Sequence, residues 1–456
     1  MSRLLFKLAA AVVFILAWTQ SSRLEPQRET GILSLDPPTP YIHYLPAGRP
    51  RARVLVVHGL DASKETMQIL SAALADGGFE VYSIDLPGHG DSPARFEAQL
   101  AERAIQNVLG TIGADSIVVG HSLGAGLLLD LAGERSFSTM VLLSPPPTPV
   151  AEVRADRVLL VSGEFDIPRI RAFAPILADT GSHVEWWQLT WAAHSSAIFN
   201  PVHVRRIVEW LGGNGEAVRT VARLIWIGVM FVAAIALGIG LMPGRRLEAL
   251  PVSIPATMVR YVLACGAAVL VLRIVMPMRW LRLFATDYLV SFLLLIGLVL
   301  WIQRRESLHV SPTTMFKAIG AAAFAIVILG LLTGSHALHI ALSNGRWWRF
   351  PFIAAAGFPL FAFDELAIRC IHPRWKSAAM ALITRALLWA FLLLGVLLLN
   401  REDAFLLLIA HLMVFFWIAL WFAAGIVHRH TQSPFAAALF AALVQGWAFA
   451  AWFVTT

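Results

Sequence analysis

The sequence predicts an α/β domain with a mostly parallel, doubly wound sheet, followed by an all-α domain of membrane-spanning helices. In the first half, short β-branched runs alternate with segments of helical spacing, the order that builds parallel sheets. In the second half, apolar runs of about 20 residues follow one another, and each is long enough to cross a bilayer. The chain is 58% hydrophobic and only 14% charged. Soluble proteins carry about a quarter charged residues, so this composition excludes an ordinary soluble protein.

The N-terminal segment over residues 1–22 resembles a targeting sequence in its composition. An apolar run from Leu4 to Trp18 has Arg3 and Lys7 near its start and polar residues after it. This pattern predicts a signal peptide or a signal anchor. The segment has no clear A-x-A cleavage site, which favours an uncleaved anchor.

The predicted strands of the first half run into loops rich in glycine, proline or polar residues. The run Arg53–Val57 leads into His58-Gly59-Leu60-Asp61, and Val81–Asp85 leads into Leu86-Pro87-Gly88-His89-Gly90-Asp91-Ser92. Later strands are predicted over Thr139–Leu143, Arg157–Val161 and Val184–Leu189. Glycines in such loops let the backbone approach a ligand closely.

The most informative motif is Gly120-His121-Ser122-Leu123-Gly124. It follows the apolar run Ser116–Val119 and precedes the small, apolar run Ala125–Leu131. In a nucleophile elbow, a strand is followed by a G-x-S-x-G turn and then by a helix. The turn is strained and exposes the serine hydroxyl. The five-residue pattern is weak alone, and the order of the surrounding strands gives it weight.

Residues from about 41 to 212 resemble the α/β-hydrolase superfamily. The motifs that carry the resemblance are His58-Gly59, Asp85–Ser92, the Ser122 elbow, Gly163-Glu164-Phe165-Asp166 and His194. Their chain order of nucleophile, acid and histidine is that of the family. The resemblance implies that Ser122, Asp166 and His194 form a catalytic triad. It also implies that the backbone N–H groups of Leu60 and Leu123 form the oxyanion hole, and it implies no cofactor.

Elementary chemistry supports the same three side chains. A serine hydroxyl is a poor nucleophile at neutral pH and needs a base within hydrogen-bond reach. Histidine is the natural base, and a carboxylate behind it holds the required tautomer. Two alternatives stay open: Glu164 could replace Asp166 as the acid, and His183 or His203 could replace His194.

No metal site is expected from the other histidines of this half. His58, His89 and His121 lie on separate loops without H-x-x-H spacing. We expect them to line or pack the site.

The expected reaction is the hydrolysis of an ester, small or lipidic. Only Pro145–Asp156 separates two strands between which many family members insert a helical cap, so we expect an open, capless site. Trp186, Trp187 and Trp191 are expected either to pack in the core or to contact acyl chains or headgroups.

A thioesterase or a peptidase would use the same triad, and the sequence does not separate these substrates. We find no nucleic-acid motif, and the sequence identifies no protein partner.

The second half, residues 223–456, follows a linker over 213–222. It is expected to hold about eight helices, at 224–242, 257–276, 283–302, 316–334, 350–371, 378–399, 404–427 and 433–454.

Basic residues concentrate in cytoplasmic loops of membrane proteins. If the N-terminus is cytoplasmic and the first segment crosses, twelve basic residues face the cytoplasm: Arg3, Lys7, Arg245, Arg246, Arg260, Arg304, Arg305, Lys317, Arg369, Arg374, Lys376 and Arg429. Five lie in short outside loops: Arg279, Arg282, Arg346, Arg349 and Arg401.

This charge distribution predicts a multi-pass cell-membrane protein whose hydrolase domain is extracytoplasmic. Two basic residues beside the first helix of this half, Arg219 and Arg223, count mildly against that orientation.

Two carboxylates, Asp364 and Glu365, lie inside one of the apolar runs. Charges within a membrane are costly and often functional. Arg369 follows Glu365 at the spacing of an intrahelical ion pair, so a structural role is equally expected. A polar pathway here would make the protein a transporter or membrane scaffold with a fused hydrolase domain.

Overall fold

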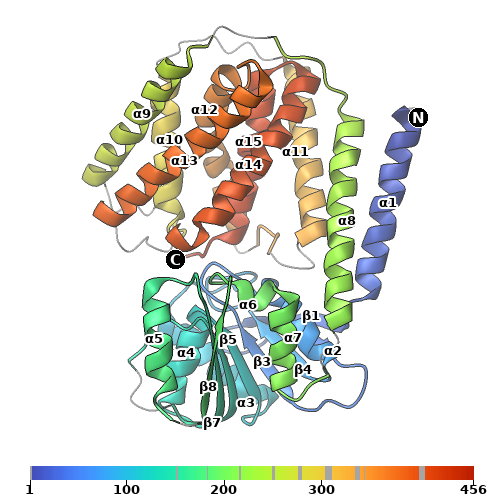
Figure 1. Ribbon diagram of the computed structural model, residues 1–456, viewed down its shortest axis with the longest axis vertical. Coiled ribbons are helices and arrows are strands. Elements are labelled where there is room, and N and C mark those ends of the chain that lie inside the picture. Colours follow the sequence, from blue (N-terminus) through green and yellow to red (C-terminus); the bar gives the residue numbers. More distant parts are fainter. Residues whose placement is uncertain are drawn as a thin grey trace. The chain divides into compact units, whose positions relative to one another are not determined.

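The computed structural model describes two compact units, which we treat separately. The described residues are 3–149, 153–181, 183–214, 217–248, 252–275, 280–302, 311–333, 339–343, 345–399 and 406–456. One unit combines Ala11–Ala233 with Gly330–Asn344 and Trp452–Thr456, and it contains the sheet. The other combines Met1–Ala10, Ala234–Leu329 and Gly345–Ala451, and it contains most of the apolar helices (Figure 1).

The described part of the first unit holds an eight-stranded sheet in the order β1-β2-β4-β3-β5-β6-β7-β8. The strands from β4 to β8 along this order pair in parallel, whereas β1 and β2 are antiparallel at one edge. This confirms the predicted mostly parallel sheet. The strands are β1 (Gln27–Leu33), β2 (Thr39–Leu45), β3 (Arg53–Val57), β4 (Glu80–Ile84), β5 (Ile117–His121), β6 (Phe137–Leu143), β7 (Ala155–Gly163) and β8 (Val184–Leu189). The sheet therefore starts before residue 41, with two strands, β1 and β2, that the sequence pattern did not indicate.

Helices cover both faces of the sheet because its strands bury side chains on both faces. Val54 and Val56 of β3 belong to one apolar core, and the alternate residues Leu55 and Val57 belong to the other. The first core is completed by α2 (Gln68–Asp76), α6 (Ser196–Phe199) and α7 (Pro201–Trp210) (Figure 1). The second is completed by α3 (Ala98–Ile112), α4 (Leu123–Ala132) and α5 (Pro168–Ala178).

The turn between β5 and α4 has the geometry of the predicted elbow. Ser122 lies at its apex with φ 52° and ψ −115°, a strained conformation for a residue with a side chain. The flanking glycines make this turn possible. A Cβ atom on Gly120 would lie 2.7 Å from the Ala125 backbone, and one on Gly124 would lie 2.5 Å from the Val57 carbonyl oxygen. Any side chain at either position would push α4 away from the sheet.

Each apolar run predicted in the second half contains a helix. They are α8 (Ala217–Leu241), α9 (Ile254–Val275), α10 (Thr286–Ile302), α11 (Pro312–Thr333), α12 (Arg349–Ala367), α13 (Arg374–Leu399), α14 (Leu406–Thr431) and α15 (Pro434–Trp452). All but α10 are long and apolar enough to cross a membrane, as is α1 (Arg3–Arg23) near the N-terminus, which makes 8 in the described residues. The basic residues Arg279, Arg304, Arg305 and Arg401 lie outside the described residues, as do residues 215 and 216 of the expected linker.

Asp364 and Glu365 of α12 are both buried and both paired. Asp364 accepts hydrogen bonds from Tyr261 of α9 and Arg385 of α13. Glu365 lies 2.7 Å from Arg369 Nη2, which confirms the expected ion pair, and 2.7 Å from His428 Nδ1 of α14. These contacts connect α12 to three neighbouring helices through polar side chains.

Candidate active site

The structure brings Ser122, His194 and Asp166 together at the ends of three different strands. The Nε2 atom of His194 lies 2.9 Å from Ser122 Oγ, and its Nδ1 atom lies 2.7 Å from Asp166 Oδ1. Ser122 follows β5, Asp166 follows β7 and His194 follows β8. Because these strands run parallel in one sheet, their carboxyl ends lie at the same edge, where open α/β sheets bind ligands.

The protonation states in this arrangement follow from the contacts of Asp166. Burial would raise the pKa of Asp166, but the hydrogen bond and charge of His194, with a further hydrogen bond from the Ile167 N–H, hold it below its usual range. An ionised Asp166 accepts the Nδ1–H of His194. The Nε2 atom of His194 is then the unprotonated nitrogen that accepts the Ser122 hydroxyl.

The alternative acid, Glu164, forms a hydrogen bond with a group other than His194. Its Oε2 atom accepts the backbone N–H of Trp191 at 2.9 Å, in the loop that carries His194. The alternative bases lie on other elements: His183 precedes β8, and His203 lies within α7. Of the candidate acids and bases, Asp166 and His194 are therefore the pair that forms hydrogen bonds in line with Ser122.

Two residues hold the backbone of His194 in place. The carbonyl oxygen of His194 accepts hydrogen bonds from His121 Nε2 and from Ser144 Oγ, both at 3.2 Å. Since a carbonyl only accepts, His121 carries its proton on Nε2. Burial, with the neighbouring His194, lowers the pKa of His121 to about 3, so this ring stays neutral at physiological pH. The sequence offered a signal only for His121, which lies inside the elbow motif.

The two residues expected to supply the oxyanion donors, Leu60 and Leu123, follow β3 and β5 at the same edge of the sheet as Ser122. Leu123 is the first residue of α4, so its N–H has no acceptor within the helix. Leu60 lies in the loop after β3. The next residue, Asp61, accepts the N–H of Val454 at 2.7 Å, and Thr455 pairs with Gly88, so the C-terminal residues brace two loops of this edge. Both oxyanion assignments stay predictions.

The remaining histidines pack in this edge of the sheet. The Nδ1 atom of His58 donates to the Gly59 carbonyl at 2.7 Å, and its Nε2 atom accepts the Leu86 N–H at 3.1 Å. Both ring nitrogens are thus used, and burial lowers the pKa of His58. The His89 ring lies beside it, tilted by 52°, with ring centroids 4.8 Å apart. These contacts give His58 a packing role and leave it no nitrogen for a metal.

The tryptophans near the site divide into two kinds. Trp186 and Trp187 pack against the two cores of the sheet. Trp191 is 86% exposed, and its ring lies against that of Phe165, which is 58% exposed, with centroids 5.7 Å apart. Phe165 directly precedes Asp166, and Trp191 lies three residues before His194. An exposed aromatic pair therefore borders the loops that carry the acid and the base.

Solved structures similar to the chain include a predicted CIB-like hydrolase from Thermoplasma acidophilum (19% identity, 41% of this chain and 98% of the other, TM-score 0.37). A second is a monoacylglycerol lipase from Paleococcus ferrophilus (20% identity, 40% of this chain and 98% of the other, TM-score 0.35). A third is the carboxylesterase CesB from Bacillus subtilis (16% identity, 45% of this chain and 100% of the other, TM-score 0.36). No curated protein matches the chain. The model of the alpha/beta hydrolase family matches residues 54–295, which is more than half of the chain. This protein belongs to the alpha/beta hydrolase family.

Proposed function

We propose that the protein is a serine hydrolase that cleaves an ester through an acyl-enzyme on Ser122. The distances from His194 to Ser122 and to Asp166 carry this proposal. His194 Nε2 takes the hydroxyl proton as Ser122 Oγ attacks the ester carbonyl, and Asp166 stabilises the imidazolium that forms. The backbone N–H groups of Leu60 and Leu123 would receive the oxyanion. His194 returns the proton to the leaving alcohol, and water then releases the acyl group by the same steps.

Three features favour a lipidic ester. The connection from β6 to β7 runs only from Ser144 to Arg154, which is too short for a helical cap over the site. The exposed pair of Phe165 and Trp191 offers an apolar surface beside the catalytic loops. The apolar helices of the chain would keep the enzyme at a bilayer, where lipids are concentrated.

The proposal is tested by labelling the full-length, detergent-solubilised protein with a fluorophosphonate and by assaying p-nitrophenyl esters of two to twelve carbons. We expect stoichiometric labelling at Ser122 and a preference for the longer acyl chains. Ser122→Ala should lose labelling and at least about a thousandfold in kcat, while its melting temperature stays near that of the wild type. Activity within about tenfold of the wild type would rule out Ser122 as the nucleophile.

We also propose that the hydrolase domain faces away from the cytoplasm. Ser343 donates a hydrogen bond to Asp91, and the Val454 N–H donates one to Asp61, so we infer that the segments 339–343 and 452–456 lie on the same side of the membrane as the sheet. Four helices, α8–α11, precede the first of these segments, and four more, α12–α15, precede the second. An even number of crossings returns the chain to its starting side, so α10 crosses as well, although it has only 17 residues.

The basic residues Arg3 and Lys7 then place the start of α1 in the cytoplasm and the sheet outside. A reporter that fluoresces only in the cytoplasm, fused after Gly213, should be dark. A bright signal would reverse this orientation.

Two alternatives use the same structure. A thioesterase or peptidase would share the triad, and matched ester, thioester and amide substrates of one acyl group separate these activities by their kcat/KM values. A transporter or scaffold would place its function in the apolar helices. The pairing of Asp364 with Arg385 and of Glu365 with Arg369 supports a structural role for these charges, so we favour the hydrolase.

A further inference from the structure

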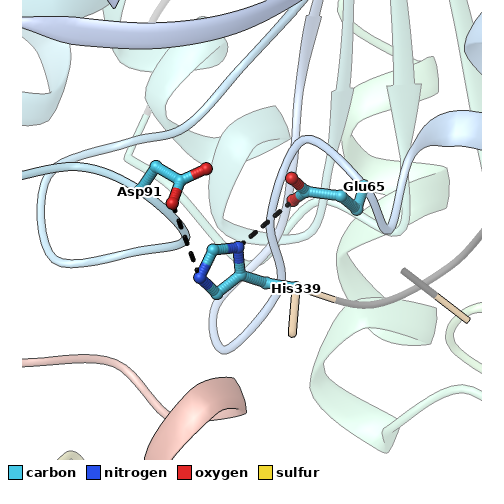
Figure 2. Close-up of side chains that lie close together, drawn as sticks. All are labelled: Glu65, Asp91 and His339. Carbon is cyan, nitrogen blue, oxygen red and sulfur yellow. Dashed lines mark ion pairs between the residues drawn. The ribbon is translucent and has the colours of Figure 1, made fainter. Parts of the chain in front are cut away.

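A second cluster of chemically versatile side chains lies on the hydrolase unit, apart from the triad residues. It consists of Glu65, Asp91 and His339, whose ligand atoms all lie within 4.8 Å of one another (Figure 2). Glu65 precedes α2, Asp91 lies in the loop after β4, and His339 lies in the described segment 339–343. The three side chains thus converge from segments that are distant in the sequence.

The distances within this cluster are longer than hydrogen bonds. His339 Nδ1 lies 3.8 Å from Glu65 Oε2, and His339 Nε2 lies 3.7 Å from Asp91 Oδ1. In the same protein the hydrogen-bonded pair of His194 and Asp166 is 2.7 Å apart. Two ligands that each lie about 2.1 Å from one ion, at a tetrahedral angle, are roughly 3.4 Å apart. The two distances involve opposite nitrogens of the His339 ring, so a single ion would bind one of these nitrogens together with an oxygen of each carboxylate.

His339 is buried and is aimed into the cluster. Its side chain is 5% exposed, and Figure 2 shows its ring between the two carboxylates. Neither its Nε2 atom nor Glu65 Oε2 has a hydrogen-bond partner among the described residues. Buried polar atoms nearly always have a partner, so these two atoms require an explanation such as a bound ion.

The charges around the cluster favour a divalent cation. Lys64 Nζ contacts one oxygen of each neighbouring carboxylate: Glu65 Oε1 at 2.9 Å, Asp91 Oδ2 at 2.8 Å and Asp85 Oδ2 at 2.6 Å. Among these four side chains three negative charges meet one positive charge, so the group carries two excess negative charges. The second oxygens of Glu65 and Asp91 point to His339. A protonated histidine would balance one of these charges, whereas a divalent ion beside a neutral histidine would balance both.

Ser343 forms a hydrogen bond with one of these oxygens. Its hydroxyl donates to Asp91 Oδ1 at 3.0 Å and so orients the carboxylate, as the outer contacts of metal ligands commonly do. Ser343 and His339 belong to the same short described segment. That segment therefore supplies both a ligand and the contact that orients another.

We propose that Glu65, Asp91 and His339 bind one divalent transition-metal ion, best matched by Zn²⁺, which fastens the segment 339–343 to the hydrolase domain. One imidazole nitrogen and two carboxylate oxygens form a donor set that suits Zn²⁺ better than Mg²⁺ or Ca²⁺, which prefer oxygen alone. Water would complete the coordination. The ligand atoms lie up to 4.8 Å apart, whereas two ligands of one ion are roughly 3.4 Å apart, so the side chains would move inward by about 1 Å when the ion binds.

The test uses the full-length protein in detergent, stripped with EDTA, dialysed and titrated with Zn²⁺ by calorimetry. The wild type should bind one Zn²⁺ per chain, and Zn²⁺ should raise its melting temperature. His339→Ala and Glu65→Gln should each weaken binding by at least about tenfold, the loss that even outer contacts of a metal ligand cause. His183→Ala removes a histidine from the turn before β8 and should bind as the wild type does.

Labelling of Ser122 verifies that each variant is folded, so a loss of binding reports on the site itself. Absence of Zn²⁺ binding by the wild type would overturn the proposal. Wild-type affinity in the labelled His339→Ala protein would overturn it as well, because the bound ion would then lie elsewhere. Displacement of Zn²⁺ by millimolar Mg²⁺ would show an all-oxygen site and would remove His339 from it.

Discussion

The Nε2 atom of His194 lies 2.9 Å from Ser122 Oγ, although 72 residues separate the two along the chain. Asp166 Oδ1 lies 2.7 Å from the other ring nitrogen. The hydrogen bond from Nδ1 to an ionised carboxylate leaves Nε2 free to accept the serine proton. This relationship is the basis of the first prediction.

Asp166→Asn should reduce kcat by about a thousandfold to ten-thousandfold, because an amide favours the wrong histidine tautomer. Glu164→Gln should stay within about tenfold of the wild type, since glutamine keeps an oxygen for the Trp191 N–H. Both are measured with a short p-nitrophenyl ester on protein quantified by size-exclusion chromatography. The opposite ranking would assign the role of the acid to Glu164.

Trp191→Ala should reduce kcat/KM for an octanoyl ester by about fivefold to tenfold, equivalent to roughly 1 kcal/mol of lost apolar contact with the acyl chain. Hydrolysis of the acetyl ester should be unchanged. Ile176 on α5 is a suitable control because it is also well exposed, at 65%. Ile176→Ala should leave both esters unaffected. Equal losses on both esters for Trp191→Ala would indicate a distorted catalytic loop instead of a lost acyl contact.

The low pKa of His121 predicts a loss of stability in acid. The folded protein protonates this ring only near pH 3, whereas the unfolded chain protonates it near pH 6.5. Between these values the unfolded state binds more protons, so the free energy of unfolding falls as the pH falls, by up to about 1.4 kcal/mol per pH unit. From pH 7 to pH 5 the melting temperature of His121→Gln should therefore decrease less than that of the wild type. Parallel curves would show that His121 is protonated in the folded state too.

The paired charges of the apolar helices predict a structural effect on mutation. Arg385→Gln leaves Asp364 buried without its cation, and breaking a buried ion pair costs about 3–5 kcal/mol. The yield of monodisperse, detergent-extracted protein should fall. The double variant with Asp364→Asn should recover part of that yield, because no charge is then left unpaired. Labelling of Ser122 per folded molecule should stay constant. A normal yield for both variants would contradict a structural role and revive the interpretation of a polar pathway.

Much of the architecture could be predicted because it depends on sequence patterns that are local. Strand runs such as Arg53–Val57 and the elbow around Ser122 are recognisable over five to seven residues, since strand periodicity and glycine sterics act between near neighbours. The apolar helices were recognisable for a similar reason, because crossing a bilayer requires about 20 apolar residues in succession. β1 was missed because its side chains are mostly exposed at the edge of the sheet, so its sequence lacks an apolar alternation.

The sequence by itself therefore determined the fold class, the membrane-like second half and the order of the three predicted catalytic residues. Only the tertiary structure showed that Asp166 contacts His194, whereas Glu164, two residues before it, accepts the Trp191 N–H. It alone revealed that Asp61 meets Val454, 393 residues away, and that Glu65 and Asp91 converge on His339. Such contacts leave no local pattern, because they depend on how distant segments are brought together by packing. The chemistry of an isolated carboxylate or imidazole is the same at every position, and its neighbours in the folded chain decide what it does.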